Sequence, residues 1–288
     1  MSFTSDRLTS ETLNIQSRIE PDKGQDLPRR AAISSTVAKA LSIVDILATK
    51  AENGISLAEL SALLNWPKST THRYLTTLLE LGLAERNSVD RFHLGTKVIE
   101  LAGSFLANSD LRNESQQNLS ELAEKALETI HLAVPSGTEV VYIAKNESKH
   151  AWGMFSHIGA RMPMHSTALG KAILAFSVIG LLQEVLAELP KSRTQNTITS
   201  AQGLEAELAL IRSRGFAIDD EENEVGIRCV GAPIVDYTGL AIAAISISGP
   251  RERMDRERCI QLGPLVRETA QRISKRRGFV GDITKAPT

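Results

Sequence analysis

The sequence predicts a mixed α/β (α+β) protein in which a winged helix-turn-helix precedes a larger domain of strands and helices. Between residues 33 and 95, three short helical periodicities are followed by two short extended segments, which is the element order of a winged helix. After about residue 132, apolar segments of strand length alternate with helical segments, and Gly, Pro or Asn punctuates most junctions. The 288 residues, 42% of them hydrophobic, suffice for two domains with buried cores.

Composition and charge exclude several classes of protein. The formal net charge is -1, so no overall positive field draws the chain to nucleic acid, and any basic patch must be local. Cys229 and Cys259 are the only cysteines and lack metal-ligand spacing, which favours a reducing compartment and predicts neither a metal nor another cofactor. No signal-peptide core is present, and no apolar run reaches the roughly 18 residues of a membrane span. We therefore expect a cytoplasmic protein with no membrane partner.

Residues 1–95 are predicted to hold a tail and then the winged helix-turn-helix. Residues 1–32 are polar and lack periodicity, so we expect a disordered tail. Helical spacing predicts a first helix over residues 37–50, with an apolar face made of Val37, Leu41, Val44, Leu47 and Ala48. Ser56, followed three residues later by Glu59, has the pattern of a capping box and predicts the start of a second helix.

The third helix and the hairpin complete the winged helix-turn-helix, predicted over residues 33–95. Pro67 is typical of the first position of a helix, and Gly82 is typical of the position just past the end of one. Two short strands are then expected, Leu83–Arg86 and Arg91–Leu94, joined by a four-residue turn.

The start of the third helix carries hydroxyl groups and cations, which indicates an anionic partner. In a helix-turn-helix this helix enters the major groove of DNA, and its free backbone N–H groups favour phosphate. The predicted contacts to double-stranded operator DNA come from this helix start and the wing, and are Lys68, Ser69, Thr70, His72, Arg73, Arg86 and Arg91. Residues 28–97 hold nine Lys or Arg and six Asp or Glu, a local charge of 9 - 6 = +3. Because this excess is modest, we expect two or more copies of the module to bind DNA together; the family resemblance described below implies that they do so as a homodimer or a dimer of dimers.

The rest of the chain is predicted to form a linker, a second domain and a short tail. Residues 96–131 have helical periodicity and are interpreted as a helical linker. The second domain is expected over residues 132–276, followed by a flexible tail at 277–288. Its expected strands are Val140–Ala144, Trp152–Ser156, Phe216–Asp219, Cys229–Val235 and Ala241–Ser248. Its expected helices are Ala168–Phe176, Ile179–Leu189, Leu204–Arg214 and Asp255–Lys275.

Several separate motifs resemble the IclR family of bacterial transcription regulators. The first half resembles the DNA-binding domain of that family, most densely at SLAELSALLNWPKSTTHRYLTTLLELGLAE, residues 56–85. The second half resembles its effector-binding domain at PMHSTALGKAILA (163–175), RGFAIDDEENEVGIRCVGAPIVD (214–236) and GLAIAAISISGP (239–250). The resemblance implies a GAF-like second domain that binds a small effector, and it covers about residues 33–275.

The resemblance also points to an effector site, for which the residues alone leave alternatives open. Positions that match effector contacts of the family, or that lie beside them, are Ala168, Leu169, Asp219, Cys229, Ser246, Ser248, Met154 and Met162. Residues 220–222 alone suggest a solvated acidic loop, whereas Asp219 lies at the end of an expected strand, where a side chain can point into a pocket. Cys229 alone suggests a small buried hydrophobe. Ser246 and Ser248 share one strand face, where they could bind a ligand carboxylate, the backbone or water.

We therefore expect a ligand-responsive transcriptional regulator, acting as a repressor, that senses a small carboxylate-bearing metabolite. Two other classes are weighed against it. A hydrolase or amidase would need a catalytic constellation, but the chain has no G-x-S-x-G motif and His165 has no nearby carboxylate in sequence. A protein-interaction scaffold would use the winged helix for protein contacts. Gly170-Lys171 lacks the spacing of a phosphate-binding loop, so His165, Ser166 or Thr167 is instead expected to cap a helix.

Overall fold

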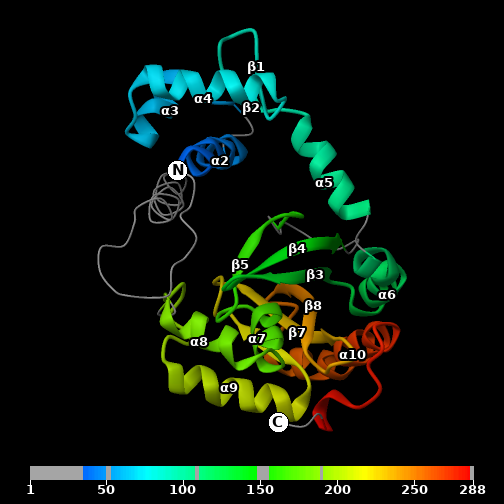
Figure 1. The fold of residues 1–288 in the computed structure, drawn as a ribbon. Coiled ribbons are helices and arrows are strands. Elements are labelled where there is room, and N and C mark those ends of the chain that lie inside the picture. The colour runs from blue at the N-terminus through cyan, green and yellow to red at the C-terminus, as the bar shows by residue number, and fades with distance from the viewer. Residues whose placement is uncertain (1–34, 50–52, 108–109, 148–155, 189–190, 286–288) are drawn as a thin grey trace. The chain divides into compact units, whose positions relative to one another are not determined.

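The computed structural model describes residues 35–49, 53–107, 110–147, 156–188 and 191–285, and the chain divides into two compact units, Met1–Asn108 and Ser109–Thr288 (Figure 1). Each unit is described by itself. The predicted disordered tail, most of the predicted strand Trp152–Ser156 and the candidate site residue Met154 lie outside the described residues.

The first unit is a winged helix-turn-helix, as predicted. Its elements are α2 (Ser35–Thr49), α3 (Leu57–Leu64), α4 (Lys68–Glu80), β1 (Ala84–Arg86), β2 (Phe92–Leu94) and α5 (Lys97–Ala107). The strands β1 and β2 pair antiparallel and form the wing. One core, drawn from α2, α3, α4 and the wing, holds the unit together and includes Ile43, Ile46, Leu60, Leu75, Leu78, Ala84 and Phe92.

Local signals in the sequence set most of the helix ends in this unit. Ser56 accepts a hydrogen bond from the backbone N–H of Glu59, and the Glu59 carboxylate accepts one from the backbone N–H of Ser56, so the predicted capping box is formed. Gly82 follows α4 with φ +70°, a conformation that glycine adopts without strain. The predicted apolar face of α2 is partly wrong, because Val37 and Leu41 are more than half exposed while Ile43 and Ile46 are buried.

The second unit contains a six-stranded antiparallel sheet with strand order β5-β4-β3-β8-β7-β6. Its strands are β3 (Thr129–Ser136), β4 (Glu139–Asn146), β5 (Arg161–Pro163), β6 (Ala217–Asp220), β7 (Ile227–Val235) and β8 (Ala241–Pro250). The two long strands β7 and β8 lie side by side, and β3 pairs with the other edge of β8.

Helices cover both faces of this sheet, which separates two cores. One face carries α7 (Ala168–Ala175), α8 (Ile179–Ala187) and α9 (Ala201–Arg214), and the other carries α6 (Asp110–Ala126) and α10 (Arg256–Arg276) (Figure 1). The core under α7 includes Ala133, Val140, Leu169, Ala172 and Ala244, whereas the core under α10 includes Ile130, Leu132, Val230, Ile245 and Ile247. Successive residues of β3, β7 and β8 thus point to opposite cores, as strand geometry requires.

The predicted linker, residues 96–131, is not one segment, because part of it belongs to the first unit and part to the second. Helix α5 lies in the first unit, whereas α6 buries Leu119 and Leu122 against the sheet of the second unit. The strand β3 begins at Thr129, inside the range expected to be helical. The sequence gives no stop signal there, because α6 is followed by Leu127 in the left-handed conformation, φ 58°, where glycine or asparagine is usual.

Leu127 is half exposed, so its left-handed backbone is not explained by burial of the side chain. We expect Leu127→Asn to raise the free energy of unfolding by about 0.5–1 kcal/mol, since asparagine tolerates this conformation better than leucine. Urea unfolding of the full chain measures the effect. Ala123→Asn, within the helical part of α6, is the control and should destabilise. A loss of stability in Leu127→Asn would show that the leucine side chain contributes packing that outweighs the strain.

Candidate DNA-binding surface and effector site

The start of α4 presents most of its predicted contact residues to solvent. Lys68, Ser69, His72 and Arg73 are exposed and Thr70 is half-buried, so they lie apart from the buried face of the helix. That buried face consists of Thr71, Leu75 and Leu78. Pro67 precedes the helix and gives it no side-chain cap, so the backbone N–H groups of Lys68 and Ser69 are available to an anion.

The cationic side chains of this surface differ in how firmly the protein already holds them. The Arg73 guanidinium lies 5.6 Å from the ring centre of Tyr74. Arg86, near the tip of the wing, pairs with Asp90 and lies 6.0 Å from the ring centre of Phe92. Arg91 instead donates to the carbonyl oxygens of residues 53 and 54 and to the Glu59 carboxylate. Arg91 is therefore held by three acceptors outside its own strand and turn, whereas Arg86 pairs only within the wing.

In the second unit, strand register gathers the predicted effector residues on the sheet face that α7 covers. Asp219 pairs with Cys229, Cys229 with Ser248, and Ser248 with Thr129, which makes one row across β6, β7, β8 and β3. In the next row, Ser246 lies opposite residues 231 and 131. Asp219, Ser246 and Ser248 are each at most 2% exposed, so polar groups crowd a buried face.

The N-terminus of α7 lies directly over this row of strands. Thr167 caps the helix and accepts a hydrogen bond from the Gly170 N–H at 3.1 Å. A Cβ atom on Gly231 would stand 3.2 Å from the backbone of Ala168, so glycine at this position lets the helix start approach β7 closely. Ala168 and Leu169 are buried in the resulting contact.

Of the remaining predicted effector residues, Met162 lies at the margin of this face, Cys229 lies within its row, and Met154 lies outside the described residues. Met162 lies on β5, is half-buried, and packs against the core under α7. Its sulfur lies 3.9 Å from the side-chain nitrogen of Asn223. Cys229 is half-buried, and burial raises the pKa of its thiol, so the group is a neutral thiol rather than a reactive thiolate.

Two further residues of this face, His131 and Tyr142, were missed by the sequence-based prediction. Their rings stack with centres 4.7 Å apart, and His131 Nε2 lies 2.8 Å from Ser156 Oγ, while its Nδ1 is buried without a hydrogen-bond partner. Burial, assisted by the Lys145 cation, lowers the pKa of His131 to about 3, so the ring is neutral. Recognition of β3 would have revealed His131, because it alternates with buried leucine and isoleucine along that strand.

The acidic residues at the end of β6 and just after it are buried or half-buried, which makes the expectation of a solvated loop wrong. Asp219 accepts hydrogen bonds from the backbone N–H groups of Glu222 at 2.8 Å and Asn223 at 3.3 Å. Burial raises the pKa of Asp219 to about 7, against the opposing effect of the Lys171 cation. Asp220 and Glu221 pair with Arg228, and Arg251 and Arg256 join this network, so each carboxylate has a structural partner.

Lys171 on α7 is fully buried and anchors this segment. Its ammonium group donates to the Glu222 carboxylate at 2.5 Å and to the carbonyl oxygen of Ile218 at 2.7 Å. Burial raises the pKa of Glu222 although the lysine opposes the shift. In the sequence, Gly170-Lys171 raised only the possibility of a phosphate-binding loop, which its spacing excluded. No residue near Lys171 in the sequence indicates that its partner is the carboxylate of Glu222.

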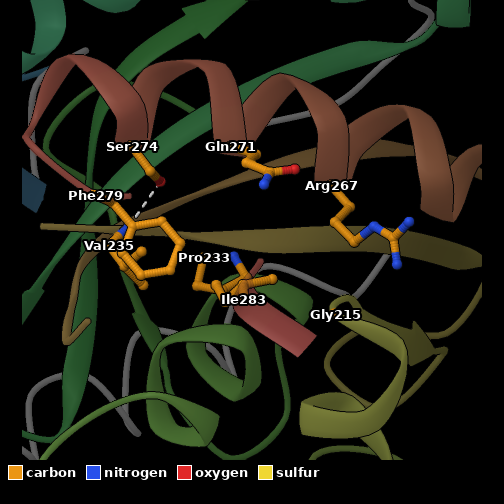
Figure 2. A pocket seen from close by; sticks show the side chains of 8 residues that line it. All are labelled: Gly215, Pro233, Val235, Arg267, Gln271, Ser274, Phe279 and Ile283. Carbon is orange, nitrogen blue, oxygen red and sulfur yellow. Dashed lines mark hydrogen bonds between the residues drawn. The ribbon is translucent and has the colours of Figure 1, made fainter. Parts of the chain in front are cut away.

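A separate hollow lies where the C-terminal segment meets α10 (Figure 2). It is lined by Gly215, Pro233, Val235, Arg267, Gln271, Ser274, Phe279 and Ile283. Its polar groups are used within the protein, since Ser274 accepts from the backbone N–H of Val235 and Gln271 donates to the carbonyl oxygen of Gly281. This hollow therefore offers a ligand fewer free polar groups than the face under α7.

Metal and membrane features were also sought within the described ranges. There, no group of three or more His, Cys, Asp or Glu side chains is arranged to hold a metal ion. In the same part of the chain, no helix has both the length and the apolar character that crossing a bilayer requires.

Comparison with known proteins identifies the family. The IclR helix-turn-helix domain model matches residues 36–88, and the model of the C-terminal domain of the bacterial transcriptional regulator IclR matches residues 103–275. The HTH-type transcriptional regulator KdgR of Escherichia coli (strain K12) is 35% identical over 256 residues, which cover 88% of this chain and 97% of KdgR. The chain belongs to the IclR family.

Solved structures agree with this assignment. The Thermotoga maritima IclR is 36% identical with a TM-score of 0.69, and the match covers 85% of this chain and 99% of that structure. The Agobacterium tumefaciens repressor BlcR is 32% identical with a TM-score of 0.53, over 85% of this chain and 97% of that one. This IclR-family protein is thus a DNA-binding transcriptional regulator, and the relatives that define it are regulators rather than enzymes.

The raised pKa of Asp219 predicts a pH dependence of stability. The folded protein holds a proton on this carboxyl that the unfolded chain releases near pH 4, so the associated stability is complete below about pH 4 and lost as pH rises through about 7. Asp219→Asn keeps an oxygen acceptor for the Glu222 N–H and mimics the neutral acid. Relative to wild type, its free energy of unfolding should rise between pH 4 and pH 8 by up to about 3 kcal/mol.

Urea unfolding across this pH range measures the difference, and Asp110→Asn on an exposed position of α6 serves as the control. A difference that stays constant with pH would mean that Asp219 is already ionised in the folded protein at low pH.

Proposed function

We propose that this regulator is a repressor whose second unit binds a small carboxylate-bearing metabolite and thereby changes operator binding. The observation that carries the proposal is the buried polar face under the start of α7, where hydroxyl, thiol, imidazole and carboxyl groups converge. Among these groups, His131 Nδ1 is buried without a hydrogen-bond partner, and a polar ligand would provide one. BlcR of Agobacterium tumefaciens is a repressor, which favours repression as the direction of control.

The proposed ligand site would divide its tasks between the helix and the sheet. The first backbone N–H groups of α7 would favour the ligand carboxylate, since a helix N-terminus carries partial positive charge. Ser246 and Ser248, which lie 3.3 Å apart, would donate hydrogen bonds to it or to a second polar group. Asp219 would tolerate a neighbouring anion, because its pKa of about 7 lets it take a proton when the ligand binds.

The predicted domain boundaries and assembly remain part of this proposal. Residues 33–95 would bind one operator half-site and residues 132–276 would bind the effector, in a homodimer or dimer of dimers that matches a two-fold symmetric operator. The predicted tails, 1–32 and 277–288, would take no part in either site. Effector binding would shift the population between arrangements that suit or misalign the two recognition helices.

Arg73 tests the DNA-binding surface. Because its side chain is exposed and lies away from Leu75 and Leu78, Arg73→Ala should weaken operator binding by roughly 1–3 kcal/mol and leave the melting temperature nearly unchanged. Fluorescence anisotropy with a duplex enriched from a random pool by the wild-type protein measures this, and Glu80→Ala at the other end of α4 is the control. Wild-type affinity in Arg73→Ala would place the recognition surface elsewhere.

Ser248 and Asp219 test the effector site. A thermal-shift screen of small organic acids supplies the ligand, because binding to the folded state raises the melting temperature. Ser248→Ala and Asp219→Ala should each lower affinity for the acid found by about tenfold, as expected for the loss of a hydrogen bond to a charged group. Binding to DNA without the acid should stay near wild type. Calorimetric titration gives the affinities, and Ser213→Ala on the exposed side of α9 is the control. Unchanged affinity in both variants would show that the effector binds at another site.

A further inference from the structure

The wing is a small element, and contacts between its side chains and the segment before α3 help to position it. Strands β1 and β2 have three residues each, and an isolated two-stranded hairpin is only marginally stable in water. One backbone link connects the wing to the segment before α3, where Ile55 and Phe92 exchange N–H···O bonds of 3.0 and 2.8 Å. Besides this bridge, the burial of Ala84 and Phe92 in the core holds the wing, and the side chains on either side of Phe92 add further attachments.

Arg91 supplies the first of these side-chain attachments. Its Nε–H donates to the carbonyl oxygen of Asn53 at 2.7 Å, and Nη2 donates to the carbonyl oxygen of Gly54 at 3.0 Å. The same Nη2 lies 3.0 and 3.4 Å from the two Glu59 carboxylate oxygens. Only a third of the Arg91 side chain is exposed, so the guanidinium is directed into the domain rather than away from it.

Glu59 joins this attachment to the start of α3. The carboxylate that receives Arg91 also accepts the backbone N–H of Ser56 at 2.8 Å and so completes the capping box. One carboxylate therefore fixes both the first turn of α3 and the base of the wing. Helices α3 and α4 form the helix-turn-helix, so the wing is tied to the frame that carries the recognition helix.

His93 supplies the attachment on the other side of Phe92. Its ring lies so close to Gly54 that a Cβ atom there would stand 2.5 Å from Nε2, and Gly54 has φ +60°. The side-chain nitrogen of Asn87 lies 3.0 Å from the same Nε2. Asn87 also accepts the backbone N–H groups of Val89 and Arg91, which orders the turn of the wing.

We propose that Arg91 is a positioning residue for DNA binding, which holds the wing against the start of α3 through Glu59, and not a phosphate contact. Its donors already satisfy two carbonyl oxygens and a carboxylate, and a move to phosphate would leave these three acceptors without it. Arg86 is then the cation that the wing presents to DNA. This role differs from the sequence-based prediction, which grouped Arg91 with Arg86 as equivalent contacts.

Two charge-matched variants separate a positioning role from a phosphate contact. Glu59→Gln and Asp90→Asn each remove one negative charge from the same unit, and glutamine can still serve in a capping box. Glu59→Gln weakens the hold on Arg91, whereas Asp90→Asn frees Arg86. On charge alone, both changes favour DNA binding. We expect Asp90→Asn to bind a duplex enriched from a random pool as tightly as wild type or more tightly, and Glu59→Gln to bind it about tenfold more weakly.

A third variant, Arg91→Lys, keeps the charge but lacks the planar fork that reaches several acceptors at once. We expect it to lose about as much affinity as Glu59→Gln and to exchange the backbone amide hydrogens of Ile55 and Phe92 faster than wild type. Hydrogen exchange and DNA binding are both measured on the full chain, with thermal unfolding to confirm that it is folded. If Glu59→Gln unfolds the domain, Arg91→Lys alone decides the outcome.

Two results overturn the proposal. One is tighter DNA binding by Glu59→Gln, equal to that of Asp90→Asn, which would mean that releasing Arg91 gives DNA a further cation. The other is near-wild-type affinity in Arg91→Lys together with unchanged amide exchange, because a phosphate contact needs only the positive charge. Each result leaves the assignment of the chain as a DNA-binding regulator intact, since that rests on the helix-turn-helix itself.

Discussion

The buried ion pair between Lys171 and Glu222 is the interaction on which the second unit depends. A fully buried ammonium group is tolerated only where a carboxylate and further acceptors replace water, and Glu222 and the carbonyl oxygen of Ile218 do so here. Lys171 stands on α7, and Glu222 stands 51 residues later in the turn after β6. Loss of either partner would leave an unpaired charge in the core, so helix and turn are held in one arrangement.

The position of Asp219 follows from that arrangement. Its carboxyl is held by the backbone N–H groups of Glu222 and Asn223, so the turn that Lys171 secures also places the candidate effector residue. Thr194 and Thr197 donate to the carbonyl oxygens of Glu221 and Glu222 and fix the turn from a third segment. Three segments distant in sequence thus hold one carboxyl in a buried place, and the cost of burying it appears as its raised pKa.

Features with local causes were predictable from the sequence, whereas features with distant causes were not. The capping box of Ser56 and Glu59, the glycine after α4 and the shared face of Ser246 and Ser248 depend on neighbouring residues, and all three are present in the structure. Strand β3 was missed because the helix before it is followed by Leu127 in a left-handed conformation. Leucine is not typical of a helix end, so the sequence contains no signal that the helix stops there. His131 was missed with that strand, and the partner of Lys171 was missed because no pattern in sequence joins the two residues. The sequence motifs contain the residues of the polar face under α7. Their position side by side follows only from the register of β3, β8, β7 and β6.

The two units differ in how they hold their candidate binding residues in place. In the second unit the polar groups are buried, and a large sheet with cores on both faces fixes them. In the first unit the contact residues of α4 are exposed, and the core that fixes this helix buries few residues of the two short wing strands, chiefly Ala84 and Phe92. Attachment by side chains at the base of the hairpin is a further way to hold the wing. Arg91 and His93, on either side of Phe92, lie where such attachment is most effective, and both reach the same backbone segment before α3.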